Sequence, residues 1–132
     1  MKFLLLQNYP GTEGVEPMAN WPAEDVEAHL KFQNELNRRL TELGELVDVQ
    51  SLTGPEMAKF VTSDGTGASV VTDGPFPEFK ELLAGYRIID VDSEARAIEI
   101  AAQVSAAPGP GGRPIRQRIE VRQVMGCVIA AL

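Results

Sequence analysis

A run of four apolar residues near the start of the chain, residues 3–6, constrains the fold more than any other feature of the sequence. Gln7, Asn8 and a break at Pro10 and Gly11 end the run, which predicts a buried β-strand. Successive side chains of a strand point to opposite faces, so both faces of this strand are apolar. The sheet that contains it therefore needs a cover on each side.

Two helices are predicted from apolar spacing. The first covers residues 23–43 and ends at Gly44, a residue typical of helix C-termini. Its apolar residues are Val26, Phe32, Leu36, Leu40 and Leu43. The second begins after Ser93, a plausible N-cap, and runs to about residue 104. Its expected buried residues are Ile98, Ala101 and Ala102.

The remaining segments predict strands. Their expected ranges are 45–52, 59–62, 69–72, 86–91 and 115–125. Asp64 and Gly65, between the second and third of these ranges, indicate a hairpin turn. The order of elements is that of an α+β, ferredoxin-like βαββαβ fold with an extra β-hairpin.

A homodimer follows from the apolar strand at residues 3–6. Two helices cover one face of an antiparallel sheet, so the other apolar face needs a cover as well. A second copy of the chain is the simplest candidate, and we expect the two copies to join through their sheet faces. Residues 1–125 would form the domain, and the apolar tail, residues 126–132, could add to the dimer interface.

Composition disfavours several classes of function. The chain has 132 residues, the size of one domain, and its net charge of −7 disfavours wide binding to nucleic acid or to an anionic membrane. The apolar start is too short for a signal peptide. With Cys127 as its single cysteine and one histidine, we expect a cytoplasmic protein with no disulfide, no metal site and no cofactor.

The strongest candidate for a functional turn is residues 73–77, Asp-Gly-Pro-Phe-Pro. Its prolines fix φ and its glycine can adopt positive φ, so the turn is stiff. This stiffness either bends the chain after a strand or aims the Asp73 carboxylate and the Phe76 ring at a ligand. The turn chemistry leaves both interpretations open.

His29, the single histidine, lies on the apolar stripe of the first helix, so we expect it to face the sheet. One interpretation is a hydrogen-bonded core histidine. The other is contact with Asp73, which would orient the ring and raise its basicity for acid–base chemistry. Trp21, Phe76 and Tyr86 would then form the apolar walls of a pocket between helix and sheet.

Positive charge gathers near the end of this acidic chain. The arginines there are Arg113, Arg116, Arg118 and Arg122. They form either a solvated strand face or, if that face lines a dimer cleft, a site for an anionic small molecule. Arg118 is the residue we expect to contact such a ligand, because a guanidinium binds an anion through two parallel hydrogen bonds.

Residues 71–76, Val-Thr-Asp-Gly-Pro-Phe, resemble the DGPF family within the YCII-related superfamily. The resemblance continues at Glu78, Lys80, Glu81, Gly85 and Tyr86, and in ranges 2–6, 43–46, 89–92 and 119–125. It implies a dimeric α/β-barrel of ferredoxin-like subunits. In proteins similar to YCII, a histidine of the first helix and a loop aspartate are proposed as an active-site pair, and the matching residues here are His29 and Asp73.

Two function hypotheses from different classes follow. The first is a small-molecule-binding protein or enzyme that uses a His29–Asp73 pair for acid–base chemistry. The alternative is a non-catalytic interaction module, because DGPF-like domains also occur joined to sigma-factor-like transcription proteins. A His29 side chain buried far from Asp73 would argue against the pair.

Overall fold

A computed structural model describes residues 1–9, 12–74 and 82–126 of the chain. Its strands are β1 (Lys2–Tyr9), β2 (Leu46–Ser51), β3 (Lys59–Ser63), β4 (Ser69–Asp73), β5 (Leu82–Asp90) and β6 (Glu120–Gln123). Its α-helices are α1 (Ala23–Glu42) and α2 (Glu94–Ser105). Three short 3-10 turns are η1 (Met18–Asn20), η2 (Pro55–Met57) and η3 (Pro110–Gly112).

Four of these strands form an antiparallel sheet in the order β2-β5-β1-β6, and β3 pairs with β4 in a separate hairpin. β1 lies in the interior of the sheet, antiparallel to β5 on one side and to β6 on the other. Without the hairpin the order of elements is βαββαβ. The prediction of an α+β fold is confirmed, and the arrangement is consistent with a ferredoxin-like domain that carries an inserted hairpin.

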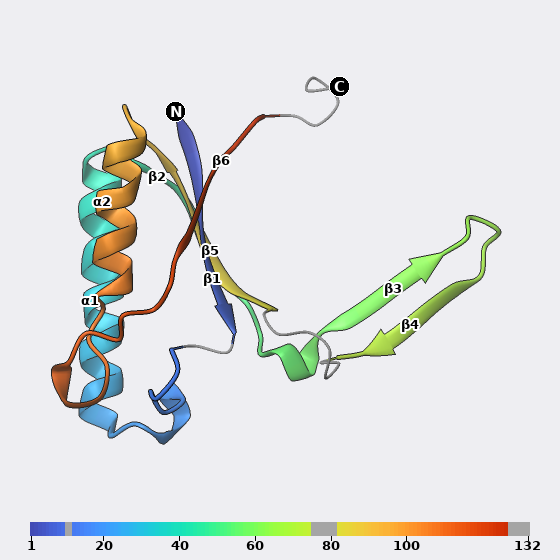
Figure 1. Cartoon of the computed structure of the whole chain (residues 1–132), viewed down its shortest axis with the longest axis horizontal. Coiled ribbons are helices and arrows are strands. Elements are labelled where there is room, and N and C mark those ends of the chain that lie inside the picture. Colours follow the sequence, from blue (N-terminus) through green and yellow to red (C-terminus); the bar gives the residue numbers. More distant parts are fainter. Residues whose placement is uncertain (10–11, 75–81, 127–132) are drawn as a thin grey trace.

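Both α-helices pack on the same face of the sheet (Figure 1). The core between them joins Phe3 and Leu5 of β1 and Ile89 of β5 to Leu36 and Leu40 of α1. Alternation along the strands explains this selection, because these residues of β1 and β5 all point toward the helices.

α2 is rotated relative to its predicted orientation. Its buried residues are Ala97, Ile100, Ala101 and Val104. The prediction of Ala101 is confirmed, but Ile98 is 55% exposed and Ala102 is also exposed. The observed stripe follows the i, i+3, i+4, i+7 pattern and buries four apolar side chains, so it covers more of the sheet than the predicted one.

The last predicted strand, residues 115–125, is shorter in the structure, because β6 alone pairs with β1. Arg116 has a φ of 60°, which breaks an extended backbone. The N–H of Gln117 donates to the carbonyl of Ser105 at 3.2 Å, and the N–H of Ile115 donates to that of Ala107 at 2.9 Å. The N–H groups of Ile115 and Gln117 therefore bond to the end of α2 and the loop after it, whereas the apolar alternation predicted bonds within the sheet.

The opposite face of the sheet carries no helix in the part of the chain that the structure describes (Figure 1). Its centre consists of Leu4 and Leu6 of β1 and Tyr86 and Ile88 of β5, which are half-buried. We call this surface the open face. Its outer residues, on the edge strands, are Asp48, Gln50, Glu120 and Arg122.

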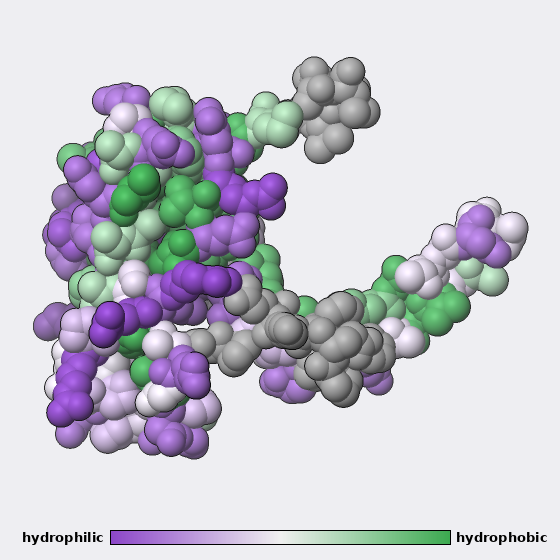
Figure 2. Space-filling view, viewed as in Figure 1, coloured by the Kyte–Doolittle hydropathy of each residue, from purple (hydrophilic) through white to green (hydrophobic). Residues whose placement is uncertain are grey.

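The β3–β4 hairpin stands away from the four-stranded sheet (Figure 1). The predicted turn at Asp64 and Gly65 is confirmed, and the Asp64 carboxylate accepts a hydrogen bond from the N–H of Thr66 at 2.9 Å. Figure 2 shows apolar surface along this arm. Its valines that are more than half exposed are Val61, Val70 and Val71. An isolated two-stranded hairpin is only marginally stable in water, so a contact that buried these valines would stabilise the arm.

The C-terminus of α1 is closed by a Schellman motif. Gly44 follows the helix with a φ of 72°, as a C′ residue does. The N–H of Glu45 donates to the carbonyl of Leu40 at 2.8 Å, and the N–H of Gly44 donates to that of Thr41 at 3.0 Å. Gly44 therefore ends α1 as predicted and directs the chain into β2.

We expect Gly44→Ala to lower the free energy of unfolding by about 1 kcal/mol, because a Cβ disfavours positive φ. Urea unfolding of the variant and of wild-type protein measures this difference. Leu43→Ala is the matched control, since Leu43 is the neighbouring residue and is 65% exposed. An unchanged unfolding midpoint for Gly44→Ala would contradict the assigned motif.

Candidate functional site

His29 lies on the sheet-facing side of α1 and is 8% exposed. The rings of Trp21 and His29 pack edge to face, with ring centroids 5.5 Å apart and an interplanar angle of 80°. On its other side, His29 Nδ1 lies 2.9 Å from the carbonyl oxygen of Pro108. The segment before α1 and the loop after α2 therefore meet at this one histidine.

Both covering segments are held by hydrogen bonds of their own. The Trp21 indole N–H donates to the carbonyl of Glu16 at 2.6 Å, within the segment that precedes α1. Beyond Pro108, the N–H of Gly111 donates to the carboxylate of Asp25, in the first turn of α1, at 3.1 Å. These contacts fix the two walls of the His29 environment against the start of the helix.

A chain of hydrogen bonds sets the tautomer of His29. Arg87 Nη2 donates to Gln33 Oε1 at 2.5 Å, so the oxygen of the Gln33 amide faces the arginine. Its Nε2 therefore faces His29 Nε2, at 3.3 Å, and can act there as a donor. His29 Nε2 is then the acceptor, and the ring proton lies on Nδ1, where it is donated to Pro108.

Arg87 is the residue of this network that the sequence analysis missed. It is 3% exposed, and burial lowers the pKa of its guanidinium, which is still charged. Its described partners are the amide oxygens of Gln33 and of Asn37, the latter at 2.9 Å. An arginine within the apolar run 86–91 was the available signal, because a strand residue flanked by apolar residues is usually buried.

Asp73 lies elsewhere, at the end of β4 and opposite Lys59 of β3. Its side chain is 77% exposed and forms an ion pair with Lys59. Within the described residues no hydrogen bond or ion pair joins Asp73 to His29, and α1 and the hairpin lie on different sides of the sheet (Figure 1). The structure of this chain therefore does not bring the two side chains together.

The other predicted ligand contacts are also separated. Tyr86 lies on the open face, the side of the sheet away from His29, and its hydroxyl donates to Asp48 Oδ2 at 3.2 Å. Burial, followed by the nearby Asp48 charge, raises the pKa of Tyr86. Arg118 lies on the exposed stretch before β6, and Phe76 lies outside the described residues, as does the tail from Cys127 onward.

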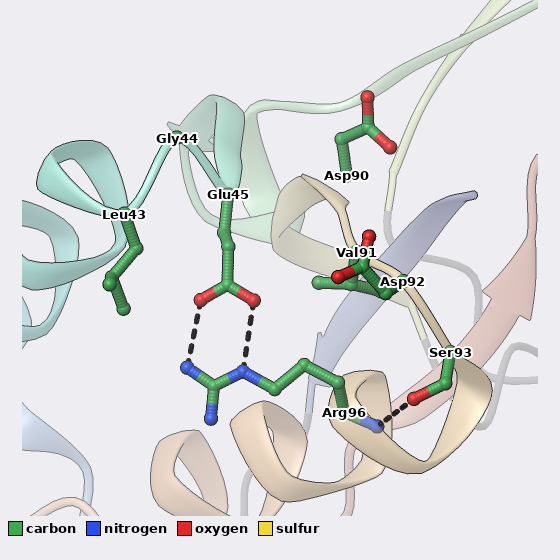
Figure 3. A pocket seen from close by; sticks show the side chains of 8 residues that line it. All are labelled: Leu43, Gly44, Glu45, Asp90, Val91, Asp92, Ser93 and Arg96. Carbon is green, nitrogen blue, oxygen red and sulfur yellow. Dashed lines mark hydrogen bonds and ion pairs between the residues drawn. The ribbon is translucent and has the colours of Figure 1, made fainter.

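A second polar site lies where α1 meets β2 and α2 begins (Figure 3). Two nitrogens of Arg96 donate to the two oxygens of Glu45, at 2.8 and 2.9 Å. This contact lowers the pKa of the Glu45 carboxyl, mainly through the hydrogen bonds from Arg96. Ser93, the predicted N-cap, accepts from the N–H of Arg96 and is confirmed in that role. At this junction of α1, β2 and α2, the charges of Arg96 and Glu45 are therefore paired with each other.

No group of histidine, cysteine, aspartate and glutamate side chains among the described residues is arranged to hold a metal ion. No helix among them has the length and apolar character needed to cross a membrane.

Comparison with known proteins gives two matches. The model of the YCII-related domain family matches residues 1–112. An uncharacterized protein of Rhizobium meliloti (strain 1021) is 33% identical over 97 residues, which cover 73% of this chain and 77% of that protein. The family match includes the His29 environment and the β3–β4 hairpin, whereas β6 lies beyond it.

We expect Gln33→Met to lower the free energy of unfolding by about 1–3 kcal/mol, because it removes an acceptor from the buried Arg87 guanidinium. Asn34→Met is the matched control: the residue is the exposed neighbour of Gln33 on α1, and its replacement should change stability by less than about 0.5 kcal/mol. Chemical denaturation measures both. Equal effects of the two variants would show that Gln33 is not needed by Arg87.

We expect Arg96→Gln to lower stability by about 1 kcal/mol at pH 7, because it removes a two-bond contact to Glu45. The pKa of Glu45 is lowered in the folded protein, so the contribution is present above the ordinary value and is lost as the pH falls below about 4.5. Unfolding curves from pH 7 to pH 3 should therefore converge for variant and wild type. Arg38→Gln is the control, since its ion pairs with Glu35 and Glu42 are exposed.

Proposed function

The chain belongs to the YCII-related domain family, and from that premise we propose that it is a homodimeric small-molecule-binding protein that uses His29 for acid–base chemistry. The observation that carries this proposal is the set of contacts around His29. A single histidine is buried between two covering segments, and its tautomer is set by named partners.

The His29 geometry suits a general base. Its Nδ1–H is held by the Pro108 carbonyl at 2.9 Å, and that contact would also stabilise the ring after Nε2 had taken a proton. Nε2 meets the Gln33 amide at 3.3 Å, a long hydrogen bond that a ligand hydroxyl or N–H could replace. Trp21 would be the apolar wall against which such a ligand packs.

Asp73 is the proposed partner of His29 in this chemistry. Its carboxylate is exposed and its ion pair with Lys59 is also exposed, so the pair costs little to break. To act with His29, Asp73 would exchange Lys59 for the histidine or reach the His29 site of a second subunit. The family resemblance supports this role, and the contacts of one subunit support His29 alone.

The apolar centre of the open face supports the proposed homodimer. Leu4, Leu6 and Ile88 occupy its centre, and the described part of the chain places no helix over them. Burial of such apolar side chains against another subunit is favourable by about 25 cal/mol for each Å² removed from water. A monomeric mass by light scattering at micromolar concentration would remove the homodimer from the proposal.

A thermal-shift screen of small metabolites tests the proposed function. We expect a compound that raises the melting temperature of wild-type protein to lose most of that effect in His29→Gln. Glu24→Gln, an exposed change at the start of α1, is the control and should keep the full shift. A compound that stabilises wild type and His29→Gln equally would show that His29 does not hold it.

The same screen decides the role of Asp73. A shift that is reduced in Asp73→Asn to the extent seen in His29→Gln supports the acid–base pair. A shift that is unchanged in Asp73→Asn confines the site to His29 and the residues around it.

A second candidate is the non-catalytic interaction module, and the β3–β4 hairpin favours it. This arm extends from the sheet and exposes Val61, Val70 and Val71 (Figure 2). The two candidates differ in what they require of His29: an interaction module keeps its function in His29→Gln and loses it when the exposed valines are replaced by serine.

A further inference from the structure

We propose that the charges on the open face encode the register of the homodimer, with Asp48 of one subunit opposite Arg122 of the partner subunit. The proposal rests on the homodimer proposed above and adds the pair of side chains that aligns it. It follows from the order in which four side chains stand across the sheet.

The strand registers place these four side chains in one row. Asp48 of β2 lies opposite Ile88 of β5, Ile88 lies opposite Leu4 of β1, and Leu4 lies opposite Arg122 of β6. Read across the open face, the row is anionic, apolar, apolar and cationic. Such a row is complementary to itself when it is reversed.

A two-fold axis that runs parallel to the strands, midway between two facing sheets, produces this reversal. Each row then lies over the same row of the other subunit, with its order inverted across the sheet. Asp48 faces Arg122 of the partner subunit, and Leu4 faces Ile88 of the partner subunit. Two facing sheets with nearly aligned strands are a common packing, and a two-fold interface must be self-complementary in this way.

The next row is compatible with the same arrangement. Gln50 lies opposite Tyr86, Tyr86 lies opposite Leu6, and Leu6 lies opposite Glu120. Reversal brings the Gln50 amide, a hydrogen-bond donor, to the Glu120 carboxylate of the partner subunit, and it brings Tyr86 to Leu6. Neither contact opposes like charges.

Hydrogen bonds within its own subunit orient the Asp48 carboxylate. The carboxylate accepts from the Tyr86 hydroxyl at 3.2 Å, from the Gln50 amide at 3.1 Å and from the N–H of Val49 at 2.9 Å. All three donors are neutral. Covering the open face would bury this half-exposed carboxylate further, and a buried carboxylate needs a cation.

Arg122 is placed to supply that cation, because its own ion pair is long and exposed. Its side chain is 72% exposed and lies 3.8 Å from the Glu120 carboxylate, a distance typical of a loose ion pair. A two-fold axis across the strands would instead stack each strand on itself and set Arg122 against Glu120 of the partner subunit. It would leave Asp48 facing Gln50, without a cation, so the axis along the strands is favoured.

Sedimentation equilibrium of wild type, Asp48→Arg, Arg122→Asp and the double variant tests the proposal. We expect each single reversal to raise the dimer dissociation constant about tenfold or more, because it opposes like charges at two symmetric places. The double variant should return to within about threefold of wild type. Glu24→Arg, the same change of charge on the exposed side of α1, should leave the constant unchanged.

Asp48→Asn provides the test if Asp48→Arg does not fold. It keeps the size of the side chain and should weaken the dimer less than charge reversal, while making dissociation less sensitive to salt. Circular dichroism and the unfolding midpoint check that each variant is folded.

The outcomes separate the two proposals. A monomeric wild type overturns the homodimer itself. A dimeric wild type with unaffected single variants overturns the charge register and leaves the homodimer standing. Rescue of Arg122→Asp by Glu120→Arg, in place of Asp48→Arg, would assign the axis across the strands and so overturn the register proposed here.

Discussion

The structure depends on one interior strand, β1, whose side chains are apolar on both faces. Phe3 and Leu5 anchor one face beneath the two helices, and this contact defines the core. Leu4 and Leu6 point the other way, where the described chain places no helix. The described chain therefore covers one apolar face of this strand, and the other face is the physical basis on which the homodimer is proposed.

The helix-covered face also contains the polar residues of the candidate site. Arg87 lies on β5 beside the apolar core, and its guanidinium donates hydrogen bonds to the amide oxygens of Gln33 and Asn37. A buried guanidinium is costly, so the amides that satisfy it are held in fixed orientations. Gln33 passes that orientation to His29, which ties the chemistry of the histidine to the packing of α1 on the sheet.

Local sequence signals predicted the elements well and their faces less well. The extent of α1, its end at Gly44, the N-cap at Ser93 and the hairpin turn at Asp64 all rest on nearby residues, and all are confirmed. The predicted burial of Ile98 and Ala102 on α2 and the strand at residues 115–119 were wrong, because distant contacts decided them. Ile98 could have faced either way, and the backbone N–H of Gln117 donates to Ser105 at the end of α2, so Gln117 contacts β1 through its side chain alone.

The sequence by itself determined that this chain is an α+β domain with an apolar strand that needs two covers, because alternation and helical period are local properties. It also placed His29 on the sheet-facing stripe of the first helix. The tertiary structure alone decided which groups surround that ring, since Trp21, Gln33 and Pro108 meet it from three separate segments. Likewise, the row from Asp48 to Arg122 exists only once strand order and register are set, because its four members come from four strands.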